Sequence, residues 1–100
     1  MPLLDITEYG ELASAGRGSL IMAGQEPSIR NQQISIAATS AQSGVLSDVT
    51  RFVRLHADAA CRISVGSNPI ASSTSMRMGA GGTEYIGVTP GLKIAVIASV

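Results

Sequence analysis

Residues 50–65 read TRFVRLHADAACRISV, and this stretch decides the class of fold. On both sides of its central ADA, side chains of similar character recur at every second position, which is the spacing of a β-strand. Val53 and Leu55 share one face of the first half, with a charged residue between them. Cys61 and Ile63 share one face of the second half in the same way. The stretch therefore predicts two half-buried strands joined by a short turn.

The same pattern continues along most of the chain. The apolar segments are rich in Ile, Val and Thr, which favour strands, and Gly, Pro and small polar residues separate them. The expected strands cover residues 33–38, 50–56, 60–65, 76–78, 83–88 and 92–99, with connections at 39–44, 66–69, 79–82 and 89–91. No window shows sustained helical periodicity, so we expect no helix. Short strands at this spacing predict an all-β fold, either a jelly-roll-like β-sandwich or a small barrel.

The last expected strand is apolar on both faces. Residues 94–97 read IAVI, so neither face of the pleat carries a polar side chain. Continuous apolarity over the length of a strand indicates burial on both sides. We expect a second sheet on one side and either a loop or a neighbouring subunit on the other.

The first thirty residues lack this regularity. ITEYGEL at residues 6–12 could begin a strand, but the small-residue sequences AGRGS and AGQEPS interrupt any repeat. We therefore expect residues 1–30 to form an extended N-terminal arm with room for one short strand. Residues 31–100 would form the β-sandwich domain, and the arm would lie against it or against a neighbouring molecule.

Composition argues against several classes of function. Seven basic and seven acidic residues leave a formal net charge of zero, so the chain lacks the positive charge on which general nucleic-acid binding depends. The N-terminus has no basic n-region, and no apolar run approaches the roughly 20 residues needed to span a bilayer. We expect an intracellular, soluble protein with neither a nucleic-acid nor a membrane partner. Charged residues make up only 14% of the chain, which suggests that another protein covers part of its surface.

His56 and Cys61 are the single histidine and the single cysteine. Alternation places them on opposite faces, so we expect a small buried cysteine and a surface histidine rather than a nucleophile and its base. A zinc site would need further ligands, and Asp58 is the only carboxylate nearby. We expect no enzymatic activity, no metal and no cofactor. A small enzyme that uses His56 and Cys61 remains the alternative from a different class.

Two other features have an ordinary structural interpretation. GAGG at residues 79–82 lacks the lysine of a phosphate-binding loop, so we interpret it as a turn. The seven acidic residues are scattered, and we expect them on the solvated surface. A carbohydrate-binding module would need more aromatic side chains than the chain's Tyr9, Phe52 and Tyr85.

Six short motifs, spread over nearly the whole length, occur together. They are Thr7-Glu8-Tyr9, Gln25-Glu26-Pro27, His56-Ala57-Asp58-Ala59, Gly66-Ser67-Asn68-Pro69, Met76-Arg77-Met78 and Thr83-Glu84-Tyr85. In this combination the chain resembles small proteins encoded among the head genes of tailed bacteriophages. These look like capsid decoration, or cement, proteins.

The resemblance implies a viral structural protein of the virion, without a cofactor, that binds the outside of the capsid and stabilises the lattice of the major capsid protein. It would be made in the cytoplasm of the bacterial host and would form a homodimer or homotrimer. The alternative within the structural class is a neck, head–tail connector or fibre-base component of the virion.

The candidate partner-binding residues follow from the exposure that alternation predicts. They are Leu3, Ile6, Tyr9 and Leu12 in the arm, Phe52 and Arg54 on the outer face of a strand, and Met76, Arg77, Met78 and Tyr85 downstream. Arg54 and Arg77 would pair with carboxylates of the capsid.

Overall fold

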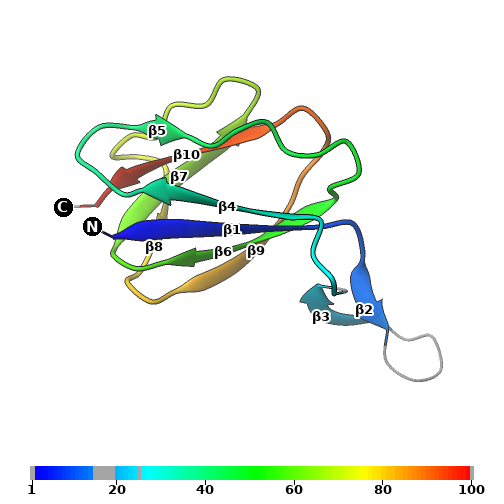
Figure 1. Ribbon diagram of the computed structural model, residues 1–100. Coiled ribbons are helices and arrows are strands. Elements are labelled where there is room, and N and C mark those ends of the chain that lie inside the picture. Colours follow the sequence, from blue (N-terminus) through cyan, green and yellow to red (C-terminus); the bar gives the residue numbers. More distant parts are fainter. Residues whose placement is uncertain (1, 15–19, 25, 100) are drawn as a thin grey trace.

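The computed structural model describes residues 2–14, 20–24 and 26–99. Within these residues the chain forms ten strands and no helix, which confirms the predicted all-β class. No helix that could cross a membrane occurs among them. Figure 1 shows two antiparallel sheets of four strands each, with a separate two-stranded hairpin at one end.

Each sheet mixes strands from distant parts of the sequence. The first sheet contains, in spatial order, β4 (Arg30–Ser35), β1 (Leu3–Tyr9), β6 (Phe52–Ala57) and β9 (Thr83–Gly87). The second contains β5 (Ala41–Gln42), β10 (Lys93–Ala98), β7 (Cys61–Gly66) and β8 (Met76–Met78). The hairpin consists of β2 (Leu12–Ser14) and β3 (Leu20–Gly24), and it projects beyond the end of β1 (Figure 1).

The alternation in residues 50–65 is confirmed. Val53 and Leu55 are fully buried, as is Cys61, while Phe52 and Arg54 are half-buried on the opposite face of β6. The two strands are not a hairpin, because β6 belongs to the first sheet and β7 to the second. The turn between them carries the chain from one sheet to the other.

The core lies between the two sheets and draws on both of them. Its buried side chains are Leu4, Ile6, Ile34, Ile36, Leu46, Val53, Leu55, Ala57, Cys61, Ile63, Met78, Val88, Ile94 and Val96. Full burial of one large apolar side chain stabilises the folded state by about 1.5–3 kcal/mol. A domain of this size depends on such a small set of contacts.

Strand β10 is covered on both sides, as its apolar sequence predicts. Ile94 and Val96 face the core, and Ala95 on the outer face is also fully buried. On that outer face the loop of residues 67–75 is bonded to side chains of the sheet: Gln42 Nε2 donates to the Pro69 carbonyl at 2.8 Å. Arg62 Nη1 likewise donates to a carbonyl of this loop at 2.9 Å. The loop therefore lies on this outer face, which favours the loop alternative.

The N-terminal arm is the part of the expected architecture that the structure does not bear out. β1 is paired with β4 on one side and with β6 on the other, so it lies inside the first sheet. Leu4 and Ile6 on its inner face are fully buried. A division at residue 30 would remove a central strand from the sandwich. Among the residues that the structure describes, the paired strands β2 and β3 are the part that leaves the sandwich (Figure 1).

Candidate functional site

Three aromatic side chains form a row across the outer face of the first sheet, and they are all the aromatic residues of the chain. Tyr9 stacks on Phe52 with ring centroids 5.4 Å apart and an interplanar angle of 20°. Phe52 contacts Tyr85 with centroids 6.1 Å apart and a tilt of 45°. Such pairs contribute about 0.5–1.5 kcal/mol each beyond the burial of their area. This aromatic row joins β1, β6 and β9 at the end of the sheet that carries the hairpin.

Tyr9 holds the base of the hairpin against the sheet. A Cβ atom on Gly24 would lie 2.4 Å from the Tyr9 ring, so only glycine fits this close approach of β3. The Tyr9 hydroxyl donates a hydrogen bond to Glu26 Oε2 at 2.5 Å. That bond and burial of the ring raise the pKa of Tyr9 to about 12. The hairpin therefore leaves the sandwich from a position fixed by packing and by a charge-assisted hydrogen bond.

An apolar hollow of about 200 Å³ lies beside the exposed end of the aromatic row. Its lining consists of Leu12, Phe52, Tyr85, Ile86 and Gly87. Tyr85 is 38% exposed, which makes it the most accessible of the three aromatic rings. The hollow combines an accessible ring with aliphatic side chains from both the hairpin and the edge of the sheet.

The rest of the outer face is polar. A shallow hollow of about 550 Å³ is lined in part by Asp5, Thr7, Asn31, Gln33 and Arg54. Asp5 Oδ1 accepts a hydrogen bond from Gln33 Nε2 at 2.8 Å. Arg54 lies between the two regions, because its ladder partners are Thr7 on β1 and Tyr85 on β9. The face therefore changes from aromatic near the hairpin to polar along the strands.

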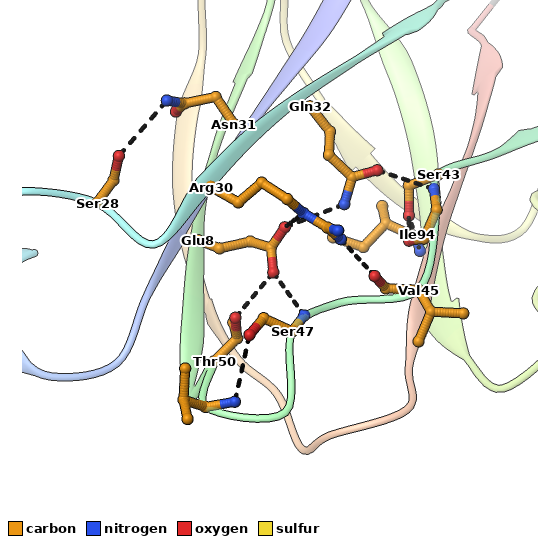
Figure 2. Close-up of polar contacts among 12 residues, drawn as sticks. Glu8, Ser28, Arg30, Asn31, Gln32, Ser43, Val45, Ser47, Thr50 and Ile94 are labelled. Carbon is orange, nitrogen blue, oxygen red and sulfur yellow. Dashed lines mark hydrogen bonds and ion pairs between the residues drawn. The ribbon is translucent and has the colours of Figure 1, made fainter.

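Glu8 is a fully buried carboxylate at the hairpin end of the sandwich (Figure 2). Its Oε2 atom accepts hydrogen bonds from Arg30 Nε at 2.8 Å and Gln32 Nε2 at 3.1 Å. Its Oε1 atom accepts from the Ser47 backbone N–H and the Thr50 hydroxyl, both at 2.8 Å. A buried charge is tolerated when it is paired and hydrogen-bonded in this way.

The surroundings of Glu8 keep it ionised. Burial alone would raise its pKa, because desolvation disfavours the charged form. The bonds from Ser47, Arg30, Thr50 and Gln32 favour the charged form and together outweigh burial, so the pKa lies below its ordinary value of 4.5. The ionised carboxylate joins β1 to β4 and to the loop of residues 43–50.

Sequence reasoning missed this network, since the acidic residues were expected on the solvated surface. That expectation is wrong for Glu8, which is 0% exposed. The signal was present in β1, where Leu4, Ile6 and Glu8 occupy successive inward positions. A carboxylate that points into the core needs hydrogen-bond donors, and for Glu8 these come from residues more than 20 positions away in the sequence.

Five of the predicted partner-binding residues come together at the hairpin end. They are Tyr9, Leu12, Phe52, Arg54 and Tyr85, placed by the aromatic row, the apolar hollow and the β6–β9 ladder. Phe52 and Arg54 lie on the outer face of β6, as predicted. No single stretch of sequence contains this group, because three different strands and the hairpin supply it.

Three other predicted residues lie elsewhere on the surface. Met76, which is 49% exposed, and Arg77 belong to β8 at the edge of the second sheet. Leu3 is half-buried at the start of β1, and its backbone N–H donates to Asp58 Oδ2 at 3.0 Å. Met76 and Arg77 thus belong to the other sheet, and Leu3 lies at the opposite end of β1 from Tyr9 and the hairpin.

The exposure expected of three candidates is wrong. Ile6 is 0% exposed, since it lies on the inner face of a central strand. Met78 is 2% exposed because its register opposite Cys61 directs it into the core. Tyr9 is 6% exposed because the hairpin covers its ring. Ile6 and Met78 stabilise the core, and Tyr9 positions the hairpin.

The histidine and the cysteine lie on opposite sides of the first sheet, as alternation predicts. Cys61 is fully buried as a free thiol, and burial raises its pKa. His56 lies on the outer face, with Nδ1 3.0 Å from Thr83 Oγ1. The Cys61 thiol is therefore a small core side chain, and His56 bonds across to the edge strand.

The glycine-rich sequence at residues 79–82 forms the predicted turn. The Gly82 backbone N–H donates to the Gly79 carbonyl at 3.0 Å, and Gly81 adopts a φ of 74°, which favours glycine. Within the described residues no group of three or more His, Cys, Asp or Glu side chains is placed to hold a metal ion.

The chain matches no known protein family, and no curated protein and no solved structure is significantly similar to it.

Proposed function

We propose that this chain is a structural protein of a virion: a decoration, or cement, subunit that binds the outside of a tailed-phage head and stabilises the lattice of the major capsid protein. The observation that carries the proposal is the hairpin of β2 and β3, which projects from one end of the sandwich (Figure 1). A projecting element of this kind can reach a neighbouring protein while the sandwich keeps its own core closed.

The hairpin end has the chemistry of a contact surface. Leu12 and Tyr85 line an apolar hollow there, and aromatic residues are enriched at the centres of protein interfaces. Arg54 lies beside the hollow and can pair with a carboxylate of the capsid protein. Tyr9 and Gly24 hold the base of the hairpin in place, which reduces the ordering cost of binding. Several such contacts from a symmetric oligomer would add through effective concentration.

The proposal includes the jelly-roll form of the sandwich and a homo-oligomeric state. Successive strands cross repeatedly between the sheets, from β4 to β5, β5 to β6, β6 to β7, β8 to β9 and β9 to β10, and this supports the jelly-roll form. A protein with 14% charged residues also has a surface suited to being covered.

The experiment is a binding assay on purified heads that lack the protein, with occupancy measured by sedimentation and gel densitometry. Arg54→Glu should reduce occupancy at least tenfold, because it places a negative charge where the capsid carboxylate would lie. Lys93→Glu is the matched control, since it also replaces a basic residue with glutamate, but on the second sheet and outside the set of candidate contact residues. Equal loss with both variants would show that the hairpin end does not direct binding.

Copy number in purified particles separates the two structural roles. A decoration protein is present on the order of hundreds of copies, whereas a neck or connector ring contains about six to twelve. Absence of the protein from mature particles would refute both.

A further inference from the structure

Strand β9 has one edge that faces away from the sheet. The Val88 N–H donates to the Arg51 carbonyl at 2.9 Å, and the Ala57 N–H donates to the Gly82 carbonyl at 3.1 Å. In the same antiparallel register, the backbone groups of Glu84 and Ile86 face β6. The backbone N–H and C=O groups of the alternate residues of β9 therefore point away from β6, towards the open edge of the sheet.

These outward-facing residues are Thr83, Tyr85 and Gly87. Among the residues that the structure describes, no backbone group of another segment bonds to their outward N–H and C=O groups. Such a row of unpaired donors and acceptors is a template for another strand.

The other edges of the two sheets are shorter or flanked. β5 contains two residues and β8 three. β4 is followed by the segment of residues 43–47, to which it is joined by the bond from the Gly44 N–H to Gln32 Oε1 at 2.8 Å and by the bond from Arg30 to the Val45 carbonyl. β9 has five residues, contains neither proline nor lysine, and has no such flanking segment in the described chain.

We propose that β9 pairs antiparallel with β9 of a second copy of this chain, about a two-fold axis that passes beside Tyr85. In this arrangement Tyr85 lies opposite the partner's Tyr85, and Thr83 lies opposite the partner's Gly87. Each of the three outward-facing residues then donates one backbone hydrogen bond and accepts one. The first sheets of the two copies become one continuous sheet.

Charge disfavours one of the two neighbouring registers, and backbone pairing disfavours both. With the axis at Tyr85, Glu84 lies opposite the partner's Ile86, so no carboxylate faces another. A shift that places the axis at Glu84 would set two carboxylates directly opposite each other, which is destabilising. That shift, and the opposite shift that places the axis at Ile86, would each leave part of the outward-facing backbone without a partner.

The side chains on the outer face fit the same axis. Arg54 is the ladder partner of Tyr85, so the row across the dimer reads Arg54, Tyr85, the partner's Tyr85 and the partner's Arg54. The two tyrosines separate the two guanidinium groups and can stack on them. Tyr85, which is 38% exposed, packs against the partner's Tyr85 through its side towards the axis, and the row of aromatic rings continues from one copy into the next.

This self-association is a property of the isolated chain and does not depend on the proposed role in a virion. Its first test is disulfide trapping of Tyr85→Cys under mild oxidation. Residues in a hydrogen-bonded antiparallel pair have Cα atoms about 5.5 Å apart, within the range that a disulfide bridges. Cys61 is fully buried, so only the introduced thiol reacts.

Glu84→Cys is the matched control. Its two copies would lie diagonally, with Cα atoms about 7–8 Å apart, which is too far for a disulfide. We expect cross-linked dimer from Tyr85→Cys and monomer from Glu84→Cys on a non-reducing gel. Cross-linking through Glu84→Cys instead would overturn the register.

The second test is sedimentation equilibrium of the unmodified protein and two variants. Thr83→Pro removes an outward-facing N–H and leaves the backbone bonds to β6 in place, and proline is tolerated on such an edge. It also removes the contact of the Thr83 hydroxyl with His56, a loss that Thr83→Ala shares. The dimer loses one hydrogen bond from each copy, so we expect its dissociation constant to rise about thirtyfold. Thr83→Ala keeps the N–H and should leave dimerisation unchanged. A monomeric unmodified protein, or a Thr83→Pro variant that dimerises normally, would overturn the proposal.

Discussion

Replacing Glu8 by Gln should destabilise the fold far more than its small change in shape suggests. The glutamine carbonyl can still accept from the Ser47 N–H and the Thr50 hydroxyl. Its amide group, however, is a donor and would face two other donors, Arg30 Nε and Gln32 Nε2. Two hydrogen bonds to a charged acceptor are therefore lost at once.

The expected loss of unfolding free energy is about 3 kcal/mol. A hydrogen bond to a charged group contributes about 1.5–3 kcal/mol, and the lower value applies here because the Arg30 side chain is 46% exposed and partly solvated. Against a total stability of about 5–15 kcal/mol, this loss is large. For a domain of this size it corresponds to a decrease in Tm of about 12–24 °C.

Urea unfolding followed by far-ultraviolet circular dichroism measures the effect. Glu11→Gln is the matched control: Glu11 is exposed, and a surface change of this kind alters stability by about 0.5 kcal/mol or less. A loss below about 1 kcal/mol for Glu8→Gln would refute the claim that the carboxylate holds the end of the sandwich together.

The same carboxylate predicts the direction of the pH dependence. The pKa of Glu8 is lowered in the folded state, so the carboxylate contributes fully to the free energy of unfolding when the pH is above the ordinary pKa of 4.5. The contribution is lost as the pH falls below that value and through the lower folded pKa. Unfolding free energy measured from pH 6 down to pH 2 should fall less steeply for Glu8→Gln than for the unmodified protein.

Three further changes test other contacts. Gly24→Ala should cost about 1–3 kcal/mol in urea unfolding, because its Cβ would lie 2.4 Å from the Tyr9 ring, whereas Gly79→Ala meets nothing within 4 Å and is the control. The pKa of Tyr9 is raised to about 12, so the contribution of its hydroxyl to the free energy of unfolding is complete below pH 10 and is lost as the pH rises towards 12. The free energy of unfolding should therefore fall less steeply with alkaline pH for Tyr9→Phe than for the unmodified protein. An equal fall would contradict the bond to Glu26. The Cys61 thiol should react with a thiol reagent only when the protein unfolds, and rapid labelling of the native protein would contradict its burial.

Local pattern predicted much of the fold, because the two-residue period of a strand depends only on neighbouring residues. It gave the inward positions of Val53, Leu55 and Cys61, and it gave cover on both sides of β10. It did not give the place of β1, whose partners lie roughly 25 and 50 residues further along the chain. An apolar alternation is present at Leu4 and Ile6, but nothing local states which strands flank it.

The candidate surface was harder to predict than the strands for the same reason. Phe52 and Arg54 were placed correctly because alternation within one strand decides their face. Met78 was misplaced because the register between β8 and β7 decides its exposure, and register is a long-range property. Glu8 was misplaced because its partners come from other segments of the chain.

The adjacent residues Glu8 and Tyr9 explain how the hairpin is held at the end of the sandwich. Because successive side chains on a strand point to opposite faces, Glu8 bonds inward to the loop at residues 43–50 while Tyr9 packs outward beneath Gly24. The last two residues of β1 are thus fixed on both faces, immediately before the chain leaves the sandwich. In the proposed function, a hairpin with such a base would present its contact residues at a smaller ordering cost than a free arm. If the proposed function is right, Glu8→Gln should therefore lower the occupancy of purified heads, even though the buried carboxylate cannot touch the capsid protein; unchanged occupancy would contradict this link.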